Sequence, residues 1–261
     1  MALGFSHHSN KRFKFLKGLV IFFILSIIFI AGFYFLLYSN FFKATIEIKG
    51  NAISSSELLK NHLIAQMLQK RKWRSIVGAE NILFWLGETK PLVVENMPAV
   101  KAVNIKVDFF QKKVFIEAKE REIVGTFCDS NSSYCYFFDE EGVLFFEAPQ
   151  TEGNLILKII DKNNRHLFLG QKALKNPQWL KNILMVWDIF QKSDVEPISI
   201  ILDDLNLRQW EIDTFSGPKF YFSLDNLPSN LAQILKGLAG RLEFNTLQYI
   251  DFRIPNRVYY K

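Results

Sequence analysis

The chain has 261 residues, about half of them hydrophobic, and carries a formal net charge of +6. This apolar content suffices for one or two folded domains and argues against a disordered chain. Four of the six charges lie in the first 17 residues, which contain no acidic residue, so the remainder carries only +2. A nearly neutral body lacks the basic surface of a nucleic-acid-binding protein, and no nucleic-acid partner is predicted.

The first predicted element is an apolar segment near the N-terminus. No charged residue lies between Gly18 and Phe42, and about 20 apolar residues in a helix cross a hydrocarbon core. A buried helix is rarely apolar on every side over such a length, and a cleaved signal peptide has a shorter apolar region with a small-residue cleavage site. We therefore predict a basic tail over residues 1–17 and an uncleaved transmembrane helix over residues 18–40.

Basic residues are more frequent before this segment than directly after it. Because basic residues stay on the cytoplasmic side of a membrane, we expect a cytoplasmic N-terminus and an extracytoplasmic body. The predicted location is the inner (cytoplasmic) membrane, in a single-pass arrangement.

The residues after the membrane segment predict a compact unit of strand, helix, helix, strand and strand. Alternating residues predict a strand over 44–50, and the serines at 54–56 offer N-cap oxygens to a helix of about three turns. Its expected apolar face consists of Leu58, Leu59, Leu63 and Ile64. The basic stretch 70–74 is interpreted as an exposed loop or helix end. A second helix is expected within residues 82–97, before Pro98, and strands over 100–109 and 114–119 follow.

Residues 122–261 predict a second, mostly antiparallel β domain with flanking helices. Its expected strands are short apolar runs separated by turn residues, at 135–138, 143–146, 155–160, 198–202, 209–214, 219–224 and 249–260. One helix is expected over 177–191, with Pro177 suited to its first position, and another over 228–242. The predicted fold class is α+β.

Cys128 and Cys135 are the two cysteines of the chain. They stand on either side of a polar segment between two β-prone runs, as at the neck of a hairpin. A disulfide is permitted outside the cytoplasm, and we predict one here, with two free thiols as the alternative. Neither His62 nor His166 lies at ligand spacing to the pair, so no metal site is predicted.

The sequence contains no nucleophile elbow, zinc-protease motif, P-loop or dinucleotide-binding motif. Two of the four histidines fall in the predicted cytoplasmic tail, which leaves His62 and His166 for an external site. Asp203 and Asp204 are the candidate carboxylates for glycoside hydrolysis, although adjacent turn residues are usually solvated. We predict no catalytic residues, no cofactor and no small-molecule substrate, and keep a membrane-anchored cell-wall hydrolase as an alternative.

The order of these parts resembles the FtsQ/DivIB family of bacterial cell-division proteins. Five motifs carry the resemblance: a strand ending in Gly-Asn, a Pro-Ala-Val-Lys segment, a Glu-Arg pair, an aromatic hairpin and a Tyr-Ile-Asp-Phe-Arg strand. They lie at residues 45–51, 97–103, 119–122, 136–145 and 247–259. The chain departs from the family at Gln111, where a proline is usual, and in its cysteine pair, which is not general.

The resemblance implies a POTRA-like βααββ domain over residues 41–121 and a β-rich domain over residues 122–261. It also implies a non-catalytic scaffold of the divisome at the division septum. Such a scaffold binds partners similar to FtsB and FtsL (DivIC in some bacteria) and other divisome proteins, and links them to septal cell-wall synthesis. A POTRA-type module of protein translocation or outer-membrane assembly is a further alternative, which would be expected to show tandem units or a barrel.

The segment 249–260 is the predicted partner-binding strand. An edge position would leave its backbone groups unpaired and available to a partner strand. Alternation places Tyr249, Asp251 and Arg253 on one face, and pairing of the last two with neighbours on a solvated face is the alternative interpretation. In the resembled family this region receives the partner's C-terminal segment, which makes Tyr249, Asp251, Arg253, Arg257 and Tyr259 candidate partner-binding residues.

Overall fold

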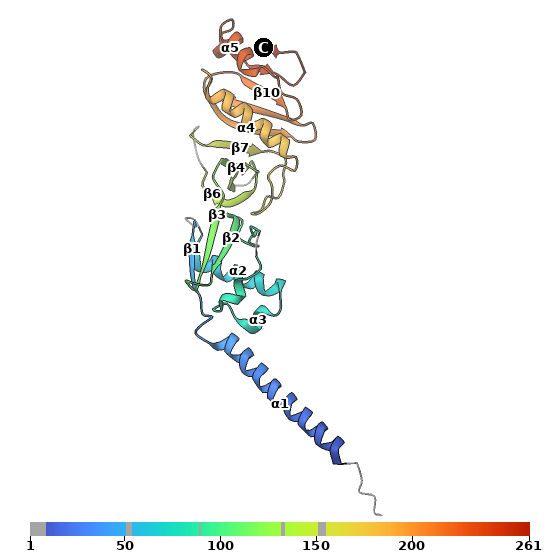
Figure 1. Ribbon diagram of the computed structural model, residues 1–261. Helices are drawn as coiled ribbons and strands as arrows, with labels where there is room; N and C mark the ends of the chain where they lie inside the picture. The colour runs from blue at the N-terminus through green and yellow to red at the C-terminus, as the bar shows by residue number, and fades with distance from the viewer. Residues whose placement is uncertain (1–8, 51–53, 89, 132–133, 151–154) are drawn as a thin grey trace, which may run out of the picture. The chain divides into compact units, whose positions relative to one another are not determined.

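The computed structural model describes residues 9–50, 54–88, 90–131, 134–150 and 155–261. The chain divides into two compact units, which are described separately here. The first contains the N-terminal helix and a three-stranded sheet, and the second contains a nine-stranded sheet (Figure 1). The predicted mixed α+β class is confirmed at this level.

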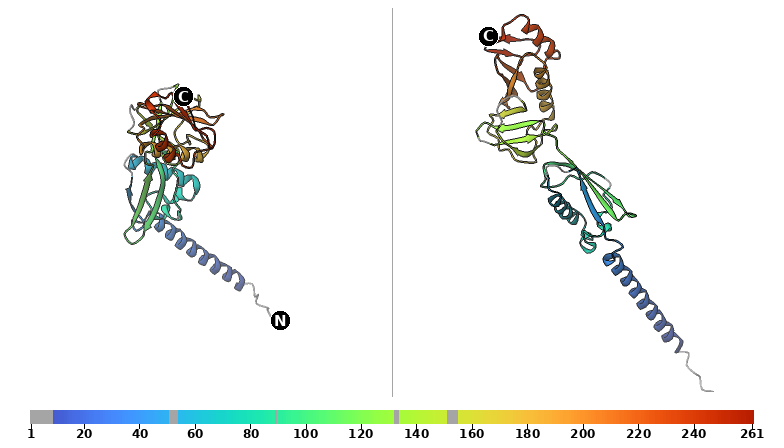
Figure 2. Two further views of the ribbon diagram at one scale, coloured as in Figure 1. Left: turned by 90° about the horizontal axis from the view of Figure 1, so that it is seen from above. Right: turned by 90° about the vertical axis from the view of Figure 1, so that its left-hand side faces the viewer.

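Helix α1 spans Ser9–Tyr38 and is drawn as one continuous helix in every view (Figure 2). Its segment Lys14–Phe35 is long and apolar enough to cross a membrane, and none of its most apolar window is buried. This agrees with the predicted span. The helix begins within the predicted basic tail, and residues 1–8 of that tail lie outside the described residues.

The sheet of the first unit has the order β1-β3-β2, with β1 parallel to β3. Its strands are Thr45–Lys49, Lys113–Glu120 and Val100–Asp108 for β1, β3 and β2. Helix α2 (Ser56–Lys70) buries Leu59, Leu63 and Met67. Ser55 occupies the N-cap position, but its side chain makes no capping hydrogen bond. The predicted Gly-Asn stop includes Asn51, which lies outside the described residues.

The predicted second helix is wrong. Among its described residues, the region 82–97 contains only the 3-10 turn η1 (Ile82–Trp85), and the short helix α3 (Arg74–Val77) precedes it. Gly87 then adopts a left-handed φ of 86°, and Leu92 forms an antiparallel bridge with Val103. Ile82, Leu92 and Val94 are therefore buried from turns and extended backbone rather than from one helical face, and Val93 is exposed.

Two details of the predicted surface also need correction. Leu58 was expected on the apolar face of α2, but it is exposed. Arg74 was expected in an exposed basic stretch, but it is fully buried. It donates hydrogen bonds to the Leu86 carbonyl and to Glu88 Oε1, each at 2.9 Å, which compensates the buried charge.

The sheet of the second unit has the order β12-β11-β10-β9-β8-β7-β4-β5-β6. Five of its neighbouring pairs are antiparallel and three are parallel, namely β10–β11, β4–β7 and β7–β8. The strands β4 to β10 span Gly125–Asp129, Cys135–Phe138, Leu144–Ala148, Leu157–Asp161, Pro197–Asp204, Gln209–Thr214 and Lys219–Ser223. The prediction of a mostly antiparallel sheet is correct, although the parallel pairs were not foreseen.

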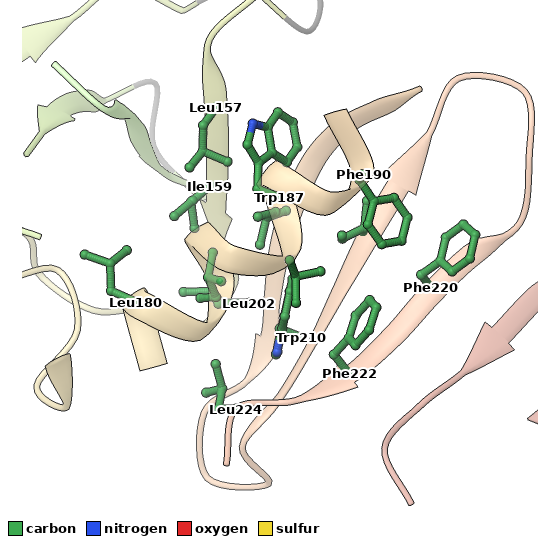
Figure 3. Close-up of a cluster of buried hydrophobic side chains, with 14 of the residues drawn as sticks. Leu157, Ile159, Leu180, Trp187, Phe190, Leu202, Trp210, Phe220, Phe222 and Leu224 are labelled. Carbon is green, nitrogen blue, oxygen red and sulfur yellow. The ribbon is translucent and has the colours of Figure 1, made fainter. Parts of the chain in front are cut away.

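The core of the second unit forms where helices α4 (Pro177–Gln191) and α5 (Leu231–Ala239) cover one face of this sheet. Leu180, Trp187 and Phe190 of α4 lie among side chains of the strands, such as Trp210 and Phe222 (Figure 3). α4 matches its predicted bounds because Asn176 caps it by accepting from the Gln178 N–H, and Pro177 begins it. α5 is shorter than the predicted 228–242.

Cys128 and Cys135 are register partners on β4 and β5. A disulfide joins them, with their Cα atoms 4.1 Å apart. The connecting turn includes residues 132 and 133, which lie outside the described residues.

The predicted single strand over 249–260 is wrong. The chain forms β11 (Tyr249–Asp251), turns, and returns as β12 (Tyr259–Tyr260) antiparallel to it. Asn256 has a left-handed φ of 60°, and Pro255 lies beside it in the turn. β11 therefore lies between β10 and β12, and the edge position expected for the whole segment belongs to β12 alone.

Candidate partner-binding site

The candidate site lies at the end of the nine-stranded sheet formed by β12. Among the described residues, no strand lies beyond β12. The strand at the other end, β6, is bordered by another segment, because backbone hydrogen bonds join Leu144 to Gly170 and Gln171. β12 is consequently the more open of the two edges.

The backbone of β12 is bonded on its inner side. The Lys261 N–H donates to the Tyr249 carbonyl, and the Lys261 carbonyl accepts from the Gln248 N–H. Successive residues of a strand direct their N–H and C=O groups to opposite sides. Those of Tyr260 therefore point away from β11, where an extended segment of a partner can pair with them.

A row of polar side chains crosses the sheet toward this edge. The strand register aligns Glu211 with Tyr221, Tyr221 with Asp251, and Asp251 with Tyr259. Directly opposed residues on neighbouring strands share a face of the sheet. These four side chains hence form one row on the face opposite α4 and α5, ending at β12.

Arg253 is held against this row by three neighbours. Its Nη2 lies 2.6 Å from Asp251 Oδ2, and its Nη1 donates to Gln209 Oε1 at 2.8 Å. Its Cζ lies 5.2 Å from the centroid of the Tyr221 ring, within the range of a cation–π contact. For Asp251 and Arg253 the geometry is that of the alternative interpretation, in which they pair with each other on the sheet face.

The ion pair keeps both groups charged. Burial of Asp251 opposes its ionisation, but hydrogen bonds from the Arg253 side chain and backbone outweigh this effect and hold the pKa of Asp251 below its usual value. The hydrogen bond to Asp251 is the main cause that raises the pKa of Arg253 above its usual value. The pair thus presents a locally neutral surface rather than an uncompensated charge.

Three further candidates remain accessible near the edge. Arg257 is exposed, and its Nη1 donates to the Tyr259 hydroxyl at 3.2 Å. The Tyr259 residue itself is 43% exposed. Tyr249 is half-buried and packs against Tyr221, with ring centroids 5.8 Å apart. Of the five predicted residues, Arg257 and Tyr259 therefore offer the most surface to a partner.

A cavity of about 600 Å³ adjoins the turn between β11 and β12. Its apolar lining consists of Leu227, Pro228, Ile234, Phe252, Ile254, Pro255 and Val258. Arg257 lines it as well. The rest of the lining is polar and includes Asn226, Asn230, Gln233 and Asn256. A hollow of this mixed kind, next to an open strand edge, can receive a large side chain of an added segment.

Neither a scan against protein-family models nor a search of curated proteins gives a match for this chain.

Sequence reasoning missed the residues that support the site from other elements. Gln209 and Tyr221 fix Arg253, and Leu227 and Pro228 line the cavity. These residues come together because β10 pairs with β11 in parallel, and the connection between the two strands contains α5. A pattern of short strands does not reveal that pairing, because parallel and antiparallel neighbours have the same alternation.

Three of the sequence motifs meet within the second unit. Arg121, from the Glu-Arg pair, forms an ion pair with the buried Asp139 of the aromatic hairpin and donates to the Pro98 carbonyl. Asp139 also accepts from the Val143 N–H at 2.9 Å and so shapes the hairpin turn. The motif residues thus have a structural role in this turn.

The two carboxylates considered for catalysis have other partners. Asp203 pairs with Lys162, with 3.2 Å between Oδ1 and Nζ, and Asp204 accepts from the backbone of the turn that follows. His62 lies on α2, and His166 is exposed in the second unit. Within the described residues, no group of three or more His, Cys, Asp or Glu side chains is arranged to hold a metal ion.

Proposed function

We propose that this chain is a membrane-anchored scaffold of the bacterial division machinery, of the kind that the FtsQ/DivIB family provides. The open edge of β12 carries this proposal, because it offers main-chain groups to a partner beside exposed tyrosines and a cavity with a partly apolar lining. The apolar helix α1, followed by a three-stranded sheet and a larger sheet, supports it through the order of the parts.

The proposed partner is the extended C-terminal segment of a membrane-bound division protein similar to FtsB, FtsL or DivIC. Its backbone pairs with Tyr260, and one of its apolar side chains enters the cavity beside Ile254 and Val258. Main-chain bonds supply affinity in such strand additions, and side-chain pockets supply specificity. Arg257 and Tyr259 flank the edge and contribute to the specificity.

The deciding experiment separates backbone pairing from side-chain contact. The full-length protein is purified from membranes with its stoichiometric partners, as wild type, Tyr260→Pro and Tyr260→Ala. Proline removes the outward N–H at an edge position, where it is tolerated by a fold, whereas alanine keeps that N–H.

Partner capture is expected to fall sharply for Tyr260→Pro and to persist, weakened, for Tyr260→Ala. Equal capture by Tyr260→Pro and wild type would exclude strand addition at β12. A fluorescent fusion tests the division role separately: a uniform distribution around dividing cells, rather than concentration at the septum, would contradict it.

The hydrolase alternative gains no specific support. The Asp203 carboxylate forms an ion pair with Lys162, and the Asp204 carboxylate accepts hydrogen bonds from backbone N–H groups. Zymography of the purified full-length protein on cell-wall material would reveal such an activity directly.

A further inference from the structure

The turn between β2 and β3 exposes two adjacent phenylalanines. Phe110 is 100% exposed and Phe109 is 49% exposed. Lys112 follows them and is exposed too. Large apolar side chains gathered on a protruding turn, next to a basic residue, are typical of a surface that contacts another phase or molecule.

The turn itself holds these side chains outward. Asp108 Oδ1 accepts a hydrogen bond from the Gln111 N–H at 3.0 Å, and Lys112 adopts a left-handed φ of 53°. The Thr45 N–H donates to the Lys112 carbonyl, which fixes the turn to the first residue of β1. The exposure of the phenylalanines is therefore part of the folded first unit.

A chain of ring contacts connects this turn to the membrane helix. Phe35 ends the apolar segment of α1 and contacts Phe42, with ring centroids 6.3 Å apart. Phe42 contacts Phe41 at 5.1 Å, and Lys112 Nζ lies 4.9 Å from the centroid of the Phe41 ring. Within the first unit, the turn thus lies at the end of the three-stranded sheet that is next to α1.

Helix α3 exposes further apolar surface at this end of the unit (Figure 1). Trp73, at its N-cap, and Ile76, within it, are both exposed. The residues after α3 contact the segment between α1 and β1, because the Ala44 N–H donates to the Glu80 carbonyl. Two separate elements thus present aromatic and aliphatic groups near the point where the chain leaves α1.

We propose that the β2–β3 turn, Phe109 to Lys112, docks onto the leaflet of the bilayer at the C-terminal end of α1. Phe109 and Phe110 enter the interfacial region, where aromatic rings are favoured, and Lys112 and Lys43 face lipid phosphates. The turn gives the first unit a second attachment to the membrane, which restricts its rotation about the linker after α1. This inference requires only that α1 crosses a bilayer and is independent of the division role.

The test places a fluorescent probe in the turn of the full-length protein. Gln111→Cys is labelled with the environment-sensitive dye NBD and reconstituted into nanodiscs of phosphatidylcholine and phosphatidylglycerol; Cys128 and Cys135 are joined to each other and do not take the dye. We expect blue-shifted emission that is quenched by lipids carrying a nitroxide near the headgroup. The control is Lys49→Cys, exposed at the far end of β1 and about 13 Å from Thr45 by strand geometry, which should stay water-like and unquenched.

The phenylalanines are tested by substitution in the labelled protein. Phe109→Ser combined with Phe110→Ser should lose most of the quenching, whereas Phe215→Ser, which removes an exposed phenylalanine of the second unit, should retain it. Water-like emission from the intact turn, or quenching that survives the double substitution, would overturn the proposal. Since no partner protein is present, either result leaves the scaffold function to its own test.

Discussion

Removal of the buried guanidinium of Arg74 should destabilise the first unit. The Arg74 side chain is fully buried, whereas that of Glu88 is 13% exposed. Arg74→Ala leaves the Glu88 carboxylate and the Leu86 carbonyl without this donor. Breaking a buried ion pair costs about 3 to 5 kcal/mol. Because Glu88 can reach solvent at one side, we expect the lower end, a loss of about 3 kcal/mol in the free energy of unfolding.

Hydrogen exchange followed by mass spectrometry can localise this effect in the full-length protein. Peptides from α2 should exchange faster in Arg74→Ala, while peptides from β8 and β9 of the second unit serve as an internal control. Lys72→Ala, an exposed neighbour, should change stability by less than about 0.5 kcal/mol. Unchanged protection of α2 in Arg74→Ala would refute the assignment of Arg74 as a structural residue.

Three further predictions concern the bond, the topology and the ion pair. The double variant Cys128→Ser/Cys135→Ser should have a free energy of unfolding about 2 to 3 kcal/mol lower than the wild type, because the disulfide closes a short loop. Alkylation of both cysteines in the wild-type protein without reductant would contradict the bond. A reporter enzyme active only outside the cytoplasm should function when fused after Lys261, and activity of a cytosol-only reporter there would reverse the topology. The lowered pKa of Asp251 means that its ionised form stabilises the fold above about pH 4 and that this contribution is lost as the pH falls through the folded-state pKa. The difference in urea unfolding between wild type and Asp251→Asn should therefore narrow from neutral pH to below about pH 4, and a difference that stays constant would exclude this origin.

Elements with local signals were predictable from sequence. Helix α4 has both a capping Asn176 and Pro177 at its first position, so its bounds follow from neighbouring residues. Strand β9 is likewise found at its predicted bounds, since turn residues flank an alternating run.

Elements whose apolar residues find distant partners were not predictable in the same way. Leu92 reads as part of a helical face, but its backbone bonds to Val103 across the unit. The residues around Arg74 predict a solvated basic stretch. Arg74 is buried because Leu86 and Glu88 supply acceptors for its guanidinium. Local sequence does not encode such tertiary contacts.

In the C-terminal segment, the alternation of buried and outward side chains was predictable, but the turn was not. The alternation that buries Ile250 and Phe252 and leaves Asp251 and Arg253 on the other face was correct for β11. Ile254, expected to continue the buried face, is exposed in the turn. Asn256 adopts a left-handed conformation, which asparagine tolerates and which can end a strand. The presence of an asparagine at this position does not by itself predict that conformation.

The small size of β12 bears on self-association. An open edge that accepts a partner strand can also pair with the same edge of a second copy, which leads to aggregation of many sheet proteins. β12 has only two residues, so two copies paired through this edge would share few backbone hydrogen bonds. A heterologous segment that also fills the neighbouring cavity buries additional apolar surface that this edge-to-edge pairing does not provide. The short edge consequently gives two copies of this chain little backbone pairing through which to dimerise, even at the high local concentrations reached in a membrane.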